Sequence, residues 1–156
     1  MKITLLAVGT RMPRWVDEAY TDYAKRFGRD ITLELKEIKP EKRGGGVTPE
    51  KGIAAEHSRL LAAIPPRARL IVLDERGRAY TSVQLADSMK RWLAEGEDLC
   101  IVIGGADGLS PELKSRADLL LQLSAMTLPH GMVRVMLAEQ LYRAVSILNN
   151  HPYHRE

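Results

Sequence analysis

The segment of this chain best suited to holding a ligand is Ile103-Gly-Gly-Ala-Asp-Gly-Leu-Ser-Pro111. Its three glycines follow an apolar stretch, and glycine lets the backbone take positive φ angles or approach a ligand closely. Ser110 and Pro111 then favour the start of a helix, where free amide groups attract polar or anionic groups. The pattern indicates a cradle for a nucleotide-sized ligand, although a glycine-rich turn that binds nothing would have the same composition.

Two familiar phosphate-binding motifs do not occur in the sequence. Gly104 and Gly105 are adjacent, so the dinucleotide pattern G-x-G-x-x-G is not formed, and G-x-x-x-x-G-K-[ST] is absent. A flavodoxin-like or dinucleotide-binding domain would also need a phosphate cradle near the first strand, where Gly9-Thr-Arg-Met-Pro13 is a poor one. NAD and ATP binding therefore lose their best support.

Side chains that can move protons or stabilise anions gather in the last quarter of the chain. Histidine and tyrosine exchange protons, and the planar guanidinium group binds an anionic base or a phosphate. The candidates are His130, Tyr153 and His154 for proton exchange, and Arg134, Arg143 and Arg155 for anion binding. Simpler roles stay open: Arg143 can pair with Glu139 one helical turn away, His130 can bond backbone at a helix start, and chain ends often fray.

The segment Pro40-Glu-Lys-Arg-Gly-Gly-Gly-Val-Thr48 is predicted to be a mobile surface loop, because it combines a glycine triplet with two adjacent cations. Lys42 and Arg43 are candidates for phosphate contacts, which give affinity without base specificity. A solvated charge pair is the simpler interpretation. The formal charge of +3 and the pI of 9.1 are compatible with a polyanionic partner but do not establish one.

The hydrophobic pattern predicts strands that alternate with helices. Strands are predicted at 3–8, 31–35, 70–73, 99–103 and 119–123. Helices are predicted after Pro13, Thr48, Thr81 and Ser110, and the last one spans 132–149. Such alternation implies a mostly parallel sheet with helices on both faces, in which ligands bind beyond the carboxyl ends of the strands. The loops after the third, fourth and fifth strands should therefore meet at one site.

The chain of 156 residues is long enough for one domain with a hydrophobic core, and we expect a single domain over 1–156. No stretch approaches the roughly 20 apolar residues of a membrane span. The single cysteine, Cys100, lies in an apolar run and is expected to be a buried thiol, which suits a reducing compartment. We expect a cytoplasmic protein that needs no metal.

Short motifs that match one known family are spread over the whole chain. They are Ala7-Val-Gly9 with Trp15, Leu73-Asp74 with Gly77, Gly104-Gly105 with Gly108-Leu-Ser110, Leu123-Ser124 with Met126-Thr127, Pro129-His130, Arg134-Val135, Glu139-Gln140, Tyr142-Arg143-Ala144, and His151-Pro-Tyr-His154. Each motif is modest, but together they are specific. The sequence resembles the RlmH branch of the SPOUT methyltransferases.

The resemblance implies an α/β-knot fold with a C-terminal trefoil knot, working as a homodimer. It also implies transfer of a methyl group from S-adenosylmethionine to N3 of a pseudouridine in large-subunit ribosomal RNA, within the assembled ribosome. The cofactor would lie against the three loops, at Leu73, Gly104, Gly105, Leu123, Ser124, Ala125, Met126, Thr127 and Leu128. Nothing in the periodicity predicts the knot, because threaded chains are very rare.

Catalysis under this hypothesis requires a group that accepts the N3 proton or stabilises the resulting anion. The candidates are His154 above all, with Tyr153, Arg143 and His130, and the candidate RNA contacts are Arg134, Arg155, Lys42 and Arg43. The apolar stripe of the last helix is too wide for one small core and favours a dimer; it comprises Met132, Val133, Met136, Leu137, Leu141 and Ala144. The tail of one subunit would then complete the partner's site.

Two other functions stay open. A methyltransferase of the same superfamily with a different RNA target would share the cofactor loops, because these are more widespread than substrate contacts. A ribosome-binding or assembly factor that keeps the fold without catalysis would also have a basic pI. Binding of S-adenosylhomocysteine separates an enzyme from a pure binding module.

Overall fold

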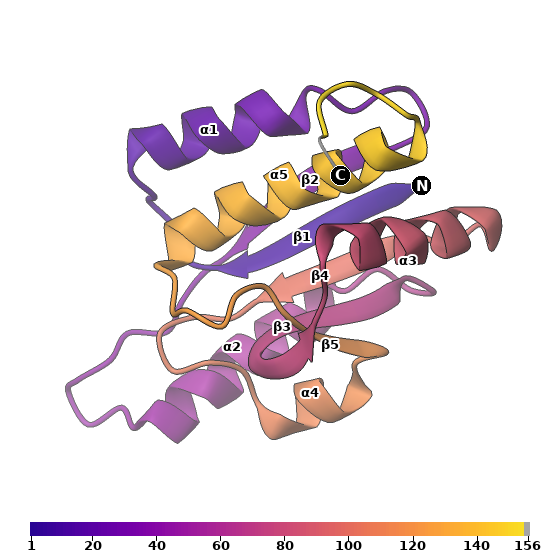
Figure 1. The fold of residues 1–156 in the computed structure, drawn as a ribbon. Helices are drawn as coiled ribbons and strands as arrows, with labels where there is room; N and C mark the ends of the chain where they lie inside the picture. The colour runs from indigo at the N-terminus through magenta and orange to yellow at the C-terminus, as the bar shows by residue number, and fades with distance from the viewer. Residues whose placement is uncertain (155–156) are drawn as a thin grey trace.

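The computed structural model of the chain describes residues 1–154. A five-stranded sheet lies at its centre in the order β2-β1-β4-β3-β5, and every neighbouring pair is parallel (Figure 1). The strands are β1 (Lys2–Val8), β2 (Thr32–Ile38), β3 (Arg69–Ala79), β4 (Leu99–Ile103) and β5 (Leu119–Gln122). The predicted parallel sheet is confirmed, and β2 lies at its edge as the polar alternation of its residues indicated.

Helices cover both faces of the sheet. They are α1 (Arg14–Ala24), α2 (Pro49–Ala63), α3 (Ser82–Ala94), α4 (Pro111–Arg116) and α5 (His130–Leu148). Helices α1, α3 and α5 pack on one face, and α2 and α4 pack on the other (Figure 1). Because side chains alternate along a strand, β1 sends Ile3 and Leu5 into the first core and Leu6 and Val8 into the second. A hydrophobic core on each face of the sheet therefore holds the strands, and with them the loops that follow the strands, in place.

The predicted helix starts agree with the capping contacts of the structure. The Thr48 side chain accepts the Lys51 amide, and Thr81 forms a reciprocal capping box with Gln84. Ser110 accepts the amide of Leu113 at 3.1 Å, so α4 begins directly after the glycine segment. Each cap satisfies an amide that the first helical turn leaves without a partner.

Strand β3 differs from the prediction because it continues to Ala79, where the polar sequence after Leu73 indicated a loop. It pairs with β5 through Leu73, shifts register, and pairs again from Arg78. A Cβ on Gly77 would lie 2.7 Å from backbone atoms of Leu121, so only glycine lets the two strands pass this closely. This tight passage is consistent with the knot that the resemblance implies.

The remaining sequence expectations concern burial. Cys100 is fully buried in β4, as predicted, and burial raises the pKa of its thiol to about 12. Among residues 1–154, no helix combines the length and the apolar character that crossing a membrane requires.

Candidate active site

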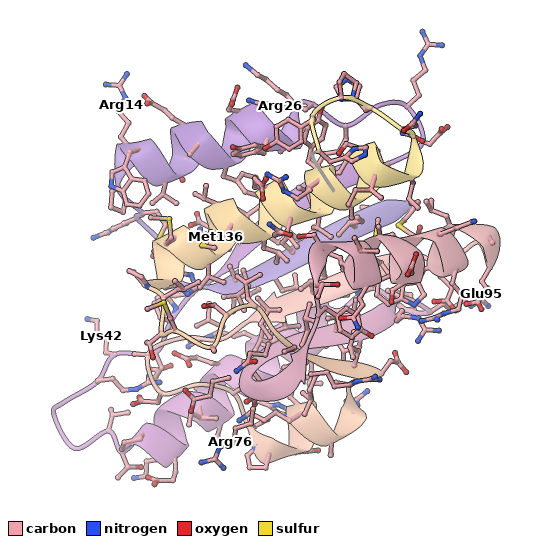
Figure 2. All side chains as sticks on the ribbon, viewed as in Figure 1. Arg14, Arg26, Lys42, Arg76, Glu95 and Met136 are labelled. Carbon is pink, nitrogen blue, oxygen red and sulfur yellow. The ribbon has the colours of Figure 1, made fainter. Side chains whose placement is uncertain are left out.

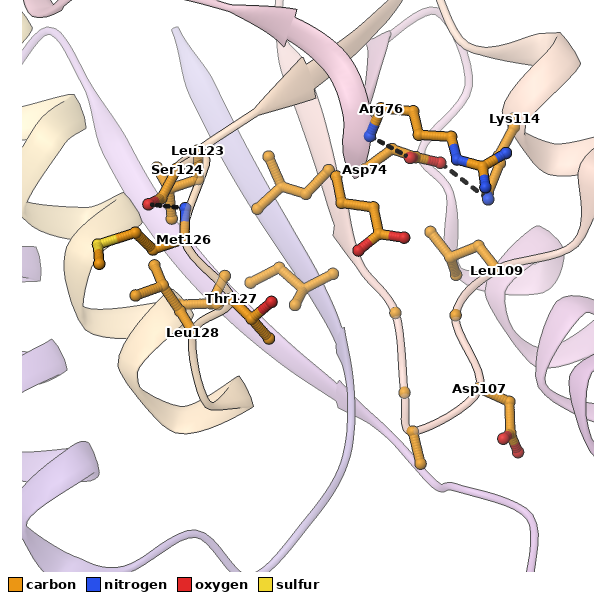
Figure 3. Close-up of a pocket in the computed structure, with 18 of the residues that line it drawn as sticks. Asp74, Arg76, Asp107, Leu109, Lys114, Leu123, Ser124, Met126, Thr127 and Leu128 are labelled. Atoms are coloured by element: carbon orange, nitrogen blue, oxygen red, sulfur yellow. Dashed lines mark hydrogen bonds and ion pairs between the residues drawn. The ribbon is translucent and has the colours of Figure 1, made fainter.

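A cavity of about 680 Å³ opens beyond the carboxyl ends of β4 and β5, beside the register shift of β3 (Figure 3). Its walls are the β3 segment from Leu73 to Arg76, the glycine segment from Ile103 to Leu109, and the loop from Leu123 to Leu128. Every residue that the resemblance assigned to the cofactor lines this cavity: Leu73, Gly104, Gly105, Leu123, Ser124, Ala125, Met126, Thr127 and Leu128. The three loops therefore converge, and the volume suits a ligand of nucleoside size.

One rim of the cavity is polar and was not predicted. Asp74 accepts the Arg76 amide and pairs with Lys114 of α4, both at 2.8 Å (Figure 3). Lys114, followed by the Arg76 amide, holds the pKa of the Asp74 carboxyl below its usual range, so this group is an anion at neutral pH. Asp107 and Glu75 add carboxylates to the same lining. Arg76 and Lys114 line the cavity as well, so its rim carries both signs of charge and can bind both cationic and anionic groups of a ligand.

A buried network ties the start of α5 to the glycine segment. The guanidinium of Arg134 donates to His130 Nε2 at 3.0 Å, to Glu37 at 2.7 Å and to the Gly9 carbonyl at 2.9 Å. His130 Nδ1 lies 3.2 Å from the carbonyl oxygen of Gly104. Because Nε2 accepts a hydrogen bond, Nδ1 carries the proton and donates it to Gly104. The network braces the carboxyl ends of β1, β2 and β4 together.

This placement favours a neutral His130. Burial first, and then the charge of Arg134, lower the pKa of its ring, and a protonated ring would oppose the donor from Arg134. Both ring nitrogens are engaged, so His130 fits the simpler role of a backbone-bonded histidine at a helix start. Arg134, a predicted RNA contact, is fully buried, and contact with RNA would require it to leave its three partners.

The tail residues predicted for catalysis fold back onto α5. The Tyr153 hydroxyl donates to Glu139 at 2.9 Å, and Arg143 donates to the same oxygen at 2.6 and 2.9 Å. The predicted helical pair of Arg143 and Glu139 is thus present. Burial first, and then hydrogen bonds with Tyr23 and Glu139, raise the pKa of Tyr153, which keeps its hydroxyl protonated. The tail cluster of Glu139, Arg143, Tyr153 and His154 is therefore ordered by contacts.

His154 is oriented by a hydroxyl group of α5. Ser146 donates its proton to the Arg143 carbonyl at 2.7 Å, and its oxygen lies 3.3 Å from His154 Nδ1. The hydroxyl proton is committed, so Nδ1 is the donor and a neutral ring has its lone pair on Nε2. A histidine in this tautomer can accept a proton at Nε2.

The tail cluster does not line the cavity of its own chain. Val133 lines the cavity, and Glu139 follows six residues later on α5. Six residues correspond to about 9 Å along the helix and about 120° around it. The tail cluster therefore occupies a different face of α5 from the cavity.

The basic residues of the 40–48 loop have different environments. Lys42 is exposed and points away from the body of the molecule (Figure 2). Arg43 turns inward and contacts Asp107 and Glu56. Arg155 lies outside the described residues.

Several cavity residues gave little sequence signal. Asp74 and Asp107 belong to recognisable motifs. Their carboxylates line one cavity only because β3 and β4 are neighbours in the sheet, which the sequence does not show. Lys114 lies on α4, and nothing in its sequence context pointed to the β3 segment from Leu73 to Arg76. Among residues 1–154, no group of histidine, cysteine and acidic side chains is arranged to hold a metal ion.

The arrangement suits group transfer more than covalent catalysis. Glycine backbone and aliphatic side chains such as Leu73 and Leu128 can enclose a flat ring, while a rim with charges of both signs can hold the polar groups of the ligand. Such a site acts by aligning two reactants rather than by supplying a nucleophile.

Comparison with known proteins agrees with this geometry. The family described as "Predicted SPOUT methyltransferase" matches residues 1–154. Proteins named ribosomal RNA large subunit methyltransferase H from Chromobacterium violaceum, Laribacter hongkongensis and Neisseria meningitidis serogroup A are 83%, 80% and 66% identical, each over the full length of both chains.

A solved structure shares the fold at low sequence identity. A probable methylase family protein from Haemophilus influenzae aligns with a TM-score of 0.58 at 14% identity, over 99% of this chain and 70% of its own. The three converging loops, the full-length family match and these relatives lead to one conclusion: this chain belongs to the SPOUT methyltransferase family.

Proposed function

We propose that this protein transfers a methyl group from S-adenosylmethionine to N3 of a pseudouridine in large-subunit ribosomal RNA. The observation that carries the proposal is the convergence of the three loops on one cavity of about 680 Å³. The name of relatives that are 83% and 80% identical supports ribosomal RNA as the substrate, and from such a substrate we infer that the protein acts in the cytoplasm. The choice of N3 follows from the resemblance of the C-terminal motifs.

The residues of the cavity fit the proposed cofactor. Leu73 and Leu128 would hold the adenine ring between aliphatic surfaces, and Gly104 and Gly105 would let backbone groups read its edge. The lining carboxylates would face the cationic sulfonium and ammonium groups, and the cations Arg76 and Lys114 would face the carboxylate of the same cofactor. When bound, the cofactor supplies an activated methyl group on a sulfonium.

The chain's own contribution is to align the base and to manage one proton. As N3 attacks the methyl carbon, the bond to sulfur breaks, and the N3 proton must leave. We infer that His154 Nε2 accepts this proton, because its tautomer presents a lone pair there. Arg143, whose guanidinium lies over the Tyr153 ring in the same tail cluster, would stabilise the anionic base.

The position of the tail cluster favours a site shared between two subunits. The cluster lies about 120° around α5 from Val133, so it does not face its own cavity. The helix also leaves Met132 and Met136 half-buried on its surface, and Trp15 of α1 is exposed. A two-fold dimer that covered this surface would place one subunit's tail near the partner's cavity.

Mixing two inactive variants tests the function and the shared site together. Ala125→Trp would fill the cavity from an exposed position, and His154→Ala would remove the proposed base. Each variant alone should fail to methylate ribosomes lacking the modification. The mixture should recover about a quarter of wild-type activity after subunit exchange, because about half the dimers are mixed and each mixed dimer has one of its two sites intact.

The readout is mass spectrometry of digested ribosomal RNA, which locates the methyl group on the base. Absence of methylation by the wild-type protein would reject the proposed reaction. Wild-type activity without any recovery in the mixture would instead reject the shared site.

A further inference from the structure

Arg43 connects the 40–48 loop to the wall of the cavity. Its guanidinium contacts Asp107 at the tip of the glycine segment, and it also reaches both carboxylate oxygens of Glu56 on α2 at 3.3 Å. A further bond of 2.7 Å joins it to the Glu41 carbonyl. One side chain thus bridges a surface loop, a helix and the candidate cofactor loop.

The site of Arg43 is built for this side chain. A Cβ on Gly52 of α2 would lie 2.3 Å from the Arg43 guanidinium, so the absence of a side chain there makes the space. The Glu56 carboxylate is 4% exposed and also accepts the Glu41 amide at 2.8 Å. A buried carboxylate of this kind requires a charged partner, and Arg43 supplies it.

The part of the cavity wall that Arg43 contacts has little support of its own. Gly105 to Gly108 form a tight turn closed by one backbone hydrogen bond of 3.1 Å, and Gly108 takes a φ of +81°. Asp107 is exposed at the tip of this turn and lines the cavity. Glu56 also lies beneath the turn, because its oxygen is 3.4 Å from the position of a Cβ on Gly105.

We propose that Arg43 is a positioning residue, which holds Asp107 and the Gly105–Gly108 turn in the shape that binds the cofactor. The planar guanidinium bonds several acceptors at fixed angles, so it can orient Asp107 while it neutralises Glu56. This role differs from the RNA contact expected from the sequence, since Arg43 faces inward. The inference rests on the proposed function, because it assumes that the cavity binds the cofactor.

A double-mutant cycle with Arg43→Lys and Asp107→Asn tests the proposal. Lysine keeps a cation beside Glu56, so folding is preserved, but it cannot bond Glu56, the Glu41 carbonyl and Asp107 at once. Titration calorimetry with S-adenosylhomocysteine should show binding weakened about tenfold in each single variant. The double variant should be no weaker than the weaker single one, because both changes cut the same contact.

Arg59→Ala is the matched control. Arg59 lies on α2, the helix that carries Glu56. It contacts the start of the same loop, because it donates to Glu41 at 2.6 Å and to the Lys39 carbonyl at 2.8 Å. Its hydrogen bonds do not include Asp107. Its binding constant should stay within about twofold of wild type. In methylation assays, Arg43→Lys should raise KM for the methyl donor and leave kcat at saturation nearly unchanged.

If the wild-type protein binds S-adenosylhomocysteine, three outcomes would overturn the proposal. They are unchanged binding in Arg43→Lys, additive losses in the double variant, and an equal loss in Arg59→Ala. Failure of the wild-type protein itself to bind S-adenosylhomocysteine would instead count against the proposed function.

Discussion

Replacing Arg134 with alanine is expected to lower the free energy of unfolding by about 3–5 kcal/mol, the range for breaking a buried charged network. The side chain is fully buried, and its removal would leave His130 Nε2 and the Gly9 carbonyl without their donor. It would also leave a cavity beside the first turns of α5. Denaturant unfolding of the variant and of wild type measures the difference.

Arg14→Ala is the control for this prediction. Arg14 is 92% exposed in its side chain and pairs with Glu18 one turn later on α1. Its loss should change the unfolding free energy by less than about 0.5 kcal/mol. A change below about 1 kcal/mol in Arg134→Ala would contradict the bracing role that we assign to the network.

Replacing His154 with alanine is expected to reduce kcat for methyl transfer by about 10²–10⁴-fold, the usual contribution of a general base. The affinity for S-adenosylhomocysteine should not change, because the proposed role of His154 is to accept the proton of the base and not to bind the cofactor. Single-turnover methylation of unmodified ribosomes and calorimetry measure the two quantities separately.

His151→Asn provides a control within the same tail. His151 accepts the Tyr153 amide at 3.1 Å through Nδ1, and the asparagine carbonyl oxygen can replace this acceptor. This variant should keep most of the wild-type rate. If His154→Ala also kept more than about a third of kcat, N3 would lose its proton without help from this residue, and the assigned base would be wrong.

The fold was predictable where local signals were strong. Thr48, Thr81 and Ser110 begin helices as their capping patterns indicated, and the apolar run Leu99–Ile103 is a strand buried on both faces. The extension of β3 to Ala79 was missed, because its partner β5 lies about forty residues further along the chain. The role of Gly77 at that crossing becomes visible only once the strands are placed together.

The site divides in a similar way. The residues predicted to bind the cofactor line one cavity, because the family motifs fall on segments that the parallel sheet brings to one edge. The ion-pair partners of Arg43 and Arg134 could not be predicted, because Asp107 and Glu37 lie far from them in the sequence. The burial of Arg134 gave no sequence signal, because adjacent residues of a helix point in different directions, and neither did Gly52, which makes room for Arg43.

The central claim is that the three loops form a pocket for the methyl donor, and calorimetric titration of the wild-type protein with S-adenosylhomocysteine tests it most directly. We predict one binding site per chain, and loss of that binding in Ala125→Trp, whose larger side chain would occupy the cavity. Folded wild-type protein that releases no heat and binds no ligand across the titration would contradict the assignment of this cavity.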